Sequence, residues 1–361
     1  MISVAAHIEL DLAALQHNVR RVREYAPESK LMAVIKANAY GHGMIRIANH
    51  LQEEVDAFAV ARIDEAINLR KANIKGKILV LQGFNQADEL FVLQDYQLDT
   101  VIHSLAQVAI LESLNLQNTL TVWLKIDTGM NRLGIDPTLF ESILSRLHKC
   151  KFVHQSIGFM THFANADDVQ DEKTPLQLQL FNNTITYHSG EKSSANSAGL
   201  IAWPATRQDW VRPGLMLYGV SPILVMTAQQ LDLLPVMNLY SRIISIKQVK
   251  KGQAVGYGGS WVAKQDSLIG VVSIGYGDGY PRYAKQGTPV LINNKRIPLI
   301  GRVSMDMITV DLSDSVDVKP GDKVKLWGDG LPVEEVAAWA GTIPYTLLCG
   351  ITPRVQVDEK S

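Results

Sequence analysis

The chain has 361 residues, of which 47% are hydrophobic and 20% are charged, and its 35 basic and 36 acidic side chains give a net charge of -1. This is the composition of an ordinary globular protein with room for two domains, and it excludes a largely disordered chain. The balanced charge argues against a nucleic acid or an anionic membrane as a partner, and we expect neither.

The N-terminal segment MISVAAHIELDLAAL carries no sign of a targeting sequence. It lacks a basic region, and Glu9 and Asp11 interrupt its apolar character, so we expect no signal peptide, no membrane span and a cytoplasmic location. The two cysteines, Cys150 and Cys349, lie far apart without metal-type spacing. We therefore predict no disulfide framework and no metal site.

Up to about residue 220, strand-like apolar runs alternate with helical segments. The runs are LMAVIK, AFAVAR, KILVLQG, DTVIH, TVWLKID, SIGFMTHF, SSANS and MLYGV. Strand-before-helix units of this kind predict a parallel sheet with right-handed crossovers, as a barrel or a doubly wound sheet. No GxGxxG follows the first run, which disfavours a dinucleotide-binding domain, and about eight strands are enough to close a barrel.

After Leu231 the pattern changes to alternating segments separated by turn sequences. These segments are YSRIISIKQV, SLIGVVSIGY, TPVLINNKRIPLI, MDMITVDLS and DKVKLWG. They predict a mostly antiparallel β domain. We place an N-terminal barrel domain at residues 1–232 and the β domain at 233–361, with the first few residues of the chain free to pair with the β domain.

Lys36 ends the first buried apolar run and is followed by a loop with two glycines before the next helical segment. In a barrel, this end of a strand is where catalytic residues collect. Partial desolvation lowers the pKa of a lysine and frees an amine that can form a Schiff base. Taken alone, a lysine that extends its charged end from the strand to solvent is the more common case.

The stretch AVIKANAYGHG, residues 33–43, resembles the cofactor-lysine motif of alanine racemases, and further matching segments cover essentially the whole chain. The resemblance implies a (β/α)8 TIM-type barrel followed by a mostly antiparallel β domain. It also implies a pyridoxal 5'-phosphate (PLP) isomerase that interconverts L-alanine and D-alanine through an external aldimine. Such an enzyme supplies D-alanine for peptidoglycan or degrades it.

A racemase needs two bases, one on each face of the substrate's α-carbon. By the resemblance these are Lys36 and Tyr257, the latter in AVGYGGSW and contributed by the partner subunit. A phenol must have its pKa lowered to act as a base near neutral pH, and His162 in MTHFANAD is the residue expected to orient it. From spacing alone, a β-turn with an exposed tyrosine and a structural histidine remain open alternatives.

Arg212, in VRPGLMLYG, is expected beneath the pyridine nitrogen of the cofactor. Unlike a carboxylic acid, an arginine does not keep that nitrogen protonated, so the ring becomes a shallow electron sink. A weakly held carbanion is reprotonated quickly at the α-carbon, which limits transamination. The alternative is that Arg212 pairs with a surface carboxylate.

The resemblance assigns the cofactor phosphate to neutral groups at the late strand ends, where a barrel commonly binds phosphate. They are Asn196, Ser197, Gly214, Leu215 and the hydroxyls of Tyr40 and Tyr345. Taken singly, each is an ordinary turn residue.

For the substrate carboxylate, the resemblance implies the guanidinium of Arg132 and the backbone amide of the partner's Met305, while the role of the neighbouring Ser304 is open. It also implies a carbamate on Lys125 that holds Arg132. Tyr276 in GYGDGY is expected to line the same pocket, unless that motif is only a β-turn. The pocket closed by these residues would be small enough to favour alanine, and the resemblance implies a head-to-tail homodimer with shared active sites.

Three alternative functions are compatible with parts of this pattern. A PLP-barrel decarboxylase shares the barrel and the lysine and gives Tyr257 no role as a base. A non-catalytic PLP-carrier protein usually lacks the β domain. A Schiff-base aldolase needs no cofactor.

Overall fold

The computed structural model describes residues 6–314 and 317–360, which form two compact units. The first, here called the barrel unit, comprises residues 18–217 and 221–227. The second, here called the β unit, comprises the described residues of segments 1–17, 218–220 and 228–361. The N-terminal strand is thus part of the β unit.

The barrel unit contains an eight-stranded sheet in the order β8-β7-β6-β5-β4-β3-β2-β9, and every neighbouring pair is parallel. The strands are β2 (Lys30–Val34), β3 (Ala57–Val60), β4 (Lys77–Val80), β5 (Asp99–Ile102), β6 (Val122–Lys125), β7 (Gly158–Met160), β8 (Lys192–Ser193) and β9 (Trp210–Val211). A parallel bridge between Asn196 and Arg212 joins the two ends of the sheet. The predicted barrel is confirmed.

The prediction of a strand at MLYGV is wrong. Leu215–Tyr218 forms a 3-10 turn, η3, and the eighth strand is instead the two-residue β9. In SSANS the strand ends at Ser193, and helix α9 (Ser197–Ala202) already begins at Ser197. A short, fully buried apolar run does not reveal by its periodicity whether it is extended or helical.

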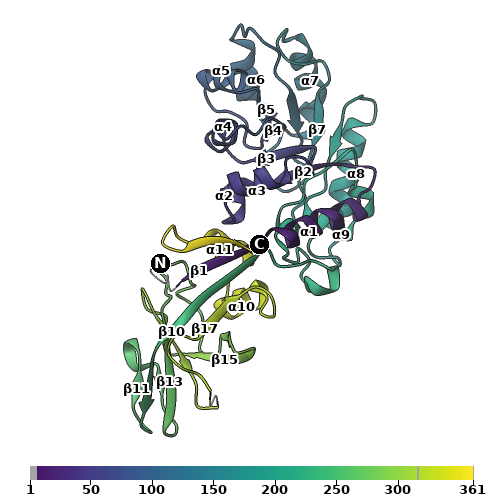
Figure 1. The fold of residues 1–361 in the computed structure, drawn as a ribbon. Helices are drawn as coiled ribbons and strands as arrows, with labels where there is room; N and C mark the ends of the chain where they lie inside the picture. The colour runs from purple at the N-terminus through teal and green to yellow at the C-terminus, as the bar shows by residue number, and fades with distance from the viewer. Residues whose placement is uncertain (1–5, 315–316, 361) are drawn as a thin grey trace. The chain divides into compact units, whose positions relative to one another are not determined.

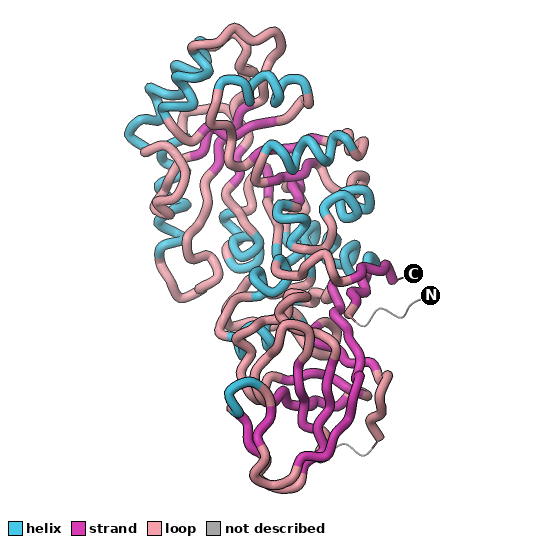
Figure 2. The backbone as a smooth tube through the Cα atoms, turned by 90° about the vertical axis from the view of Figure 1, so that its left-hand side faces the viewer, coloured by secondary structure: helices cyan, strands magenta, loops and turns pink. Residues whose placement is uncertain are grey.

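Helices follow the barrel strands and surround them (Figures 1 and 2). Besides α9 they are α3 (Met44–Leu51), α4 (Ile63–Lys71), α5 (Ala87–Asp95), α6 (Leu105–Glu112), α7 (Phe140–Lys149) and α8 (Lys173–Ile185), while α1 (Leu12–Tyr25) precedes β2. Glu65 and Glu89 begin α4 and α5 in the same way, because each carboxylate accepts the backbone N–H groups just before its helix.

The β unit is built on the long strand β10 (Met237–Val249), which pairs with three other strands. Its sheet order is β13-β16-β15-β14-β17-β10-β1-β18, and β13 also pairs with β10. The remaining strands are β1 (His7–Asp11), β13 (Ser267–Val272), β14 (Pro289–Ile292), β15 (Lys295–Ile300), β16 (Ile308–Asp311), β17 (Lys323–Trp327) and β18 (Gln356–Lys360), and the hairpin β11 (Ala254–Val255) and β12 (Trp261–Val262) stands apart.

The β unit is mostly antiparallel, as the alternating segments predict, and only the pairing of β1 with β18 is parallel among its described strands. Two helices that the strand pattern did not reveal, α10 (Val333–Ala340) and α11 (Pro344–Cys349), also belong to it. No helix within the described ranges is both long enough and apolar enough to cross a bilayer.

Candidate functional site

The barrel gathers four of the predicted residues at the carboxyl ends of its strands. Lys36 follows β2, Lys125 ends β6, His162 follows β7 and Arg212 follows β9. Because β2 pairs with β9 and β6 pairs with β7, these side chains start from neighbouring strand ends. Parallel strands thus bring together residues that lie far apart in the sequence.

The turn after Lys36 has an unusual backbone. Ala37, Asn38, Ala39 and Tyr40 all have φ between 52° and 54°, in the left-handed region. This conformation costs about 1–2 kcal/mol per residue for a side chain other than glycine. The segment was expected as a glycine-containing loop, and nothing in its residue types predicts four left-handed residues in succession.

Buried hydrogen bonds hold the strained turn in place. The ring nitrogen Nδ1 of His42 lies 2.9 Å from the carbonyl oxygens of both Ala39 and Tyr40, and it donates because both partners are acceptors. Burial lowers the pKa of His42 to about 4, so the imidazole stays neutral at pH 7. The Asn38 side chain also accepts the backbone N–H of Met44 at 2.8 Å, which joins the turn to helix α3.

Arg212 is buried, with 5% of its surface exposed, and its guanidinium binds only uncharged groups among the described residues. Nη1 donates to Ser193 Oγ at 2.5 Å, and Nη2 donates to the Thr161 carbonyl at 2.6 Å. Nη2 also lies 3.5 Å from His162 Nδ1. Burial lowers the pKa of Arg212 to about 10, so the group remains a cation at neutral pH. No carboxylate of a described residue pairs with it.

Positive charge accumulates around these strand ends. Burial, followed by the charges of Arg212, Arg132 and Lys36, lowers the pKa of Lys125 to about 7, and only Asp127 acts in the opposite direction. Burial and the same cations hold the pKa of His162 well below its usual range, so this histidine is neutral at pH 7. The site therefore favours anionic ligands.

A buried chain of hydrogen bonds, which the sequence did not reveal, joins the loops after β6 and β7. Thr161 Oγ1 donates to the Ile126 carbonyl at 2.9 Å, so in its 2.8 Å contact with Thr128 Oγ1 it must accept. Gln177 of α8 in turn donates from Nε2 to Thr128 Oγ1 at 3.2 Å and to the His162 carbonyl at 3.3 Å. Its Oε1 accepts the backbone N–H of Ala164 at 3.0 Å.

The loop that carries Arg132 is shaped by the carboxylate of Asp127 and by a glycine at position 134. Asp127 Oδ1 accepts the backbone N–H groups of Gly129 and Asn131, at 2.9 and 3.1 Å. Gly134 has φ of 139°, and a Cβ there would overlap the Asp127 backbone. The exposed Arg132 is thus presented by a loop that needs glycine at this point.

Tyr40, Ser197 and Gly214 converge close to Arg212. A Cβ added to Gly214 would lie 2.5 Å from the Tyr40 hydroxyl oxygen, so glycine makes room for that hydroxyl. Ser197 Oγ accepts the backbone N–H of Gly214 at 2.8 Å and keeps its own hydrogen for donation. Asn196 instead caps α9 by accepting the Gly199 N–H at 2.8 Å, and Leu215 is buried, with 3% of its surface exposed.

The remaining predicted residues lie in the β unit and are all partly exposed. Tyr257 begins a 3-10 turn, η5 (Tyr257–Gly259), and is 68% exposed, whereas Met305 is 53% exposed. Tyr276 and Tyr345 are 40% and 39% exposed, and Tyr345 lies in α11. Their side chains are therefore accessible to a ligand or a partner.

We also considered a ligand pocket at the amino ends of the barrel strands and a metal site. The amino ends of the barrel strands enclose a cavity of about 30 Å³, lined by Asp99 and Trp210 among others, which has room for about one water molecule. No cluster of three or more His, Cys, Asp or Glu side chains that could hold a metal ion occurs in the described ranges 6–314 and 317–360.

Family models match both units of the chain. Residues 10–222 match the alanine racemase N-terminal domain, and residues 236–358 match the alanine racemase C-terminal domain. A curated alanine racemase from Vibrio parahaemolyticus is 48% identical over 354 residues, which cover 98% of this chain and 99% of the relative.

Solved structures agree over the whole length. The crystal structure of the biosynthetic alanine racemase from Pseudomonas aeruginosa matches with a TM-score of 0.97 and 41% identity, covering 99% of this chain and 100% of that one. The structure of alanine racemase from Bartonella henselae with covalently bound pyridoxal phosphate matches with a TM-score of 0.90 and 28% identity, again covering 99% and 100% of the two chains.

The role of Gln177 can be tested by Gln177→Leu, with Gln179→Leu at an exposed position of the same helix as the control. Leucine leaves buried partners of Gln177 unsatisfied, so we expect Gln177→Leu to lower the free energy of unfolding by about 1–3 kcal/mol. Gln179→Leu should change it by less than about 0.5 kcal/mol. The measurement is urea unfolding, and equal midpoints for the two variants would contradict the assigned hydrogen bonds.

Proposed function

This chain belongs to the alanine racemase family, and we propose that it interconverts L-alanine and D-alanine with PLP as its cofactor. The observation that carries the proposal is the concentration of positive charge at the carboxyl ends of the barrel strands, with buried Arg212 at its centre. A buried cation without a carboxylate partner is costly, and an anionic ligand offsets part of that cost. PLP supplies a phosphate, and an amino acid supplies a carboxylate.

The residues at these strand ends fit such a cofactor. The Tyr40 and Ser197 hydroxyls and the backbone near Gly214 form a neutral cradle suited to the phosphate. The Nη atoms of Arg212 bind protein groups, and no described residue accepts from Nε, so Nε would be the donor to an unprotonated pyridine nitrogen. Lys36 provides the amine that binds the cofactor aldehyde. We keep Asn196, Leu215 and Tyr345 as proposed cofactor contacts.

When bound, PLP delocalises the electron pair left on the α-carbon after proton removal. The chain's own task is to move protons at that carbon: Lys36 Nζ on one face and Tyr257 Oη on the other. His162 suits the supporting role, because its neutral ring faces Arg212 through Nδ1 and therefore carries its hydrogen on Nε2. That hydrogen is available to the Tyr257 oxygen.

The substrate carboxylate is assigned to Arg132 and to the backbone N–H of Met305. Within the described residues no acceptor takes that N–H, and Met305 is half-exposed, so the donor is available. With Tyr276, Tyr257 and Tyr345 around it, the pocket admits only a small side chain. Tyr257 and Met305 act from a partner subunit in this proposal, so the enzyme is a homodimer with shared sites, and we place it in the cytoplasm.

The alternative functions have less support. The full-length relatives named alanine racemase share the β unit, which a barrel-only PLP-carrier protein would lack. A decarboxylase would release carbon dioxide from a basic amino acid and would tolerate loss of the Tyr257 hydroxyl.

The two-base assignment is tested by Lys36→Ala and Tyr257→Phe, with α-proton exchange measured from each enantiomer of alanine. Each variant removes the base on one face, so we expect exchange from one enantiomer to fall far more than exchange from the other. The enantiomer affected should differ between the two variants. Symmetric losses would rule out bases on opposite faces.

The shared-site assignment predicts that mixed subunits recover activity. A dimer of one Lys36→Ala and one Tyr257→Phe subunit has one site with both native residues and one site with neither. After subunit exchange, half of the dimers are mixed, so activity should return to about a quarter of the native value. If both bases came from one chain, mixing would restore nothing.

We also propose that Lys125 carries a carbamate. With its pKa near 7, a large fraction of the amine is uncharged at neutral pH, and an uncharged amine adds to carbon dioxide with release of one proton. The product is an anion in place of a cation, so it attracts Arg132, whereas the ammonium repels it.

Carbon-13 NMR of the native protein in labelled bicarbonate tests this proposal, with Lys125→Arg as the control. The amine loses its proton as the pH rises through about 7, so the carbamate signal should grow across that interval and be missing from the control. Electron density for a bare ammonium in crystals grown with bicarbonate would refute the carbamate.

A further inference from the structure

The glycine-rich loop GYGDGY, Gly275–Tyr280, packs against two other segments of the β unit through its glycines. A Cβ on Gly275 would overlap the carbonyl oxygens of Ser304 and Met305, and one on Gly279 would overlap the backbone at Gly350. Backbone hydrogen bonds join the same segments, from Tyr276 N to the Ser304 carbonyl at 3.1 Å and from Gly277 N to the Met305 carbonyl at 2.8 Å. The loop is therefore more than a simple β-turn.

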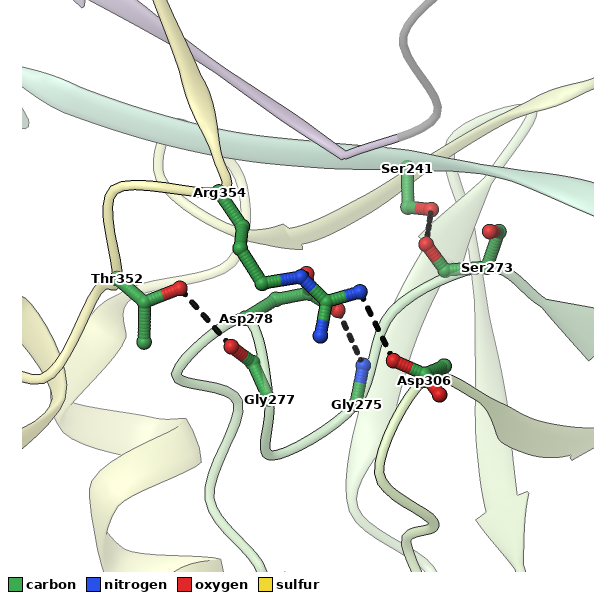
Figure 3. Close-up of polar contacts among 8 residues, drawn as sticks. All are labelled: Ser241, Ser273, Gly275, Gly277, Asp278, Asp306, Thr352 and Arg354. Atoms are coloured by element: carbon green, nitrogen blue, oxygen red, sulfur yellow. Dashed lines mark hydrogen bonds and ion pairs between the residues drawn. The ribbon is translucent and has the colours of Figure 1, made fainter.

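Arg354 crosses this junction (Figure 3). Its Nη2 donates to Asp306 Oδ1 at 2.8 Å, and its Nε lies 3.4 Å from Asp278 Oδ1. Asp278 is nearly buried, with 8% of its side chain exposed, and its other oxygen accepts the Gly275 N–H at 3.0 Å. One guanidinium thus ties the loop to the residue that follows Met305.

The C-terminal segment that presents Arg354 is itself fixed to the loop. Thr352 Oγ1 donates to the Gly277 carbonyl at 2.9 Å (Figure 3), and the Thr352 backbone N–H donates to the Asp278 carbonyl at 3.1 Å. At the start of the loop, Ser241 of β10 donates from Oγ to the Ser273 carbonyl at 2.8 Å. A Cβ on Gly277 would lie 2.5 Å from Arg354 Nη1, so glycine also makes room for the guanidinium.

We propose that Arg354 is a positioning residue for substrate binding: by bridging Asp278 and Asp306 it fixes the backbone of Met305 and Tyr276. This inference rests on the proposed function, which assigns the Met305 N–H to the substrate carboxylate. The Met305 N–H shares a peptide plane with the Ser304 carbonyl, which accepts the Tyr276 N–H. On the other side of Met305, its carbonyl accepts the Gly277 N–H, and the bridge restrains Asp306, the next residue. Together they set the direction of the free N–H.

The proposed role predicts a change in KM rather than in kcat. A carboxylate contact is made by both the bound substrate and the transition state, so its loss weakens binding without slowing the chemical step. Arg354 and Asp306 are each about half-exposed, so the ion pair itself adds little stability. A misdirected N–H, however, loses the hydrogen bond to the substrate.

The experiment compares Arg354→Met, Asp306→Asn and the double variant of the holoenzyme. The control is Arg296→Met, which breaks another exposed ion pair of the β unit, the one with Glu335. We expect Arg354→Met to raise KM for alanine about tenfold with kcat changed less than about twofold. The double variant should have the same KM as Arg354→Met, because Asp306→Asn breaks an ion pair that Arg354→Met has already removed. Arg354→Lys should recover part of the loss, since it reaches one carboxylate but not both.

Hydrogen–deuterium exchange of the native protein and each variant gives a second reading that does not depend on activity. Arg354→Met should speed exchange in residues 274–280 and 303–307, and Arg296→Met should not. If the native protein does not racemise alanine, the proposed function fails, while the exchange rates still support or overturn the bridge. If Arg354→Met does not fold, the KM and the hydrogen–deuterium exchange of Asp306→Asn test the proposal instead. Unchanged KM and exchange in the variant that folds overturn the proposal.

Discussion

The buried guanidinium of Arg212 is the interaction on which the carboxyl end of the barrel depends. It binds Ser193 at the end of β8 and the Thr161 carbonyl after β7, and it follows the closing strand β9 directly. All of these partners are uncharged, so the cation is buried without a counter-ion and its field reaches the neighbouring titratable groups. The energetic cost of that burial is what makes an anionic ligand favourable at this end of the barrel.

That field explains two protonation states that residue types alone could not give. Lys125 has its pKa lowered to about 7 by burial and by Arg212, Arg132 and Lys36, and His162 remains neutral for the same reasons. A cationic His162 would repel Arg212 and could not accept at Nδ1. Burial and the neighbouring cations thus lower the pKa of Lys125 and keep His162 neutral, and the contact with Arg212 sets the tautomer of His162.

The sequence predicted the architecture because its strands repeat a simple pattern, buried apolar run before helix. It failed where that pattern was short or hidden. Strand β9 has two residues, so the longer run at Met216 was mistaken for the closing strand, and helices α10 and α11 were missed among alternating strands. The position of Lys36 followed from the end of its predicted strand, whereas Arg212 was found through the family resemblance, because the strand β9 before it was not predicted.

The supporting residues could not be predicted, because their roles depend on contacts that no local pattern encodes. Gln177 lies on a helix and acts on loops 13 and 49 residues away. His42 looked like one residue of a glycine-containing loop, yet its ring stabilises four left-handed residues. Arg354 reads as a charged residue near the C-terminus until the fold places Asp278 and Asp306 beside it.

These three residues hold the backbone of segments that carry functional groups, and they are not assigned a contact with the cofactor or the substrate. His42 holds the turn after Lys36, Gln177 holds the carbonyl of His162, and Arg354 holds the segment of Met305. The strained turn held by His42 and the glycine-rich loop held by Arg354 would have several accessible conformations without the side chain that fixes them. A loop can present a functional group accurately only if buried or bridging hydrogen bonds remove that freedom beforehand, because freedom lost on binding lowers affinity. Each unit thus fixes its functional groups separately, through hydrogen bonds made within that unit.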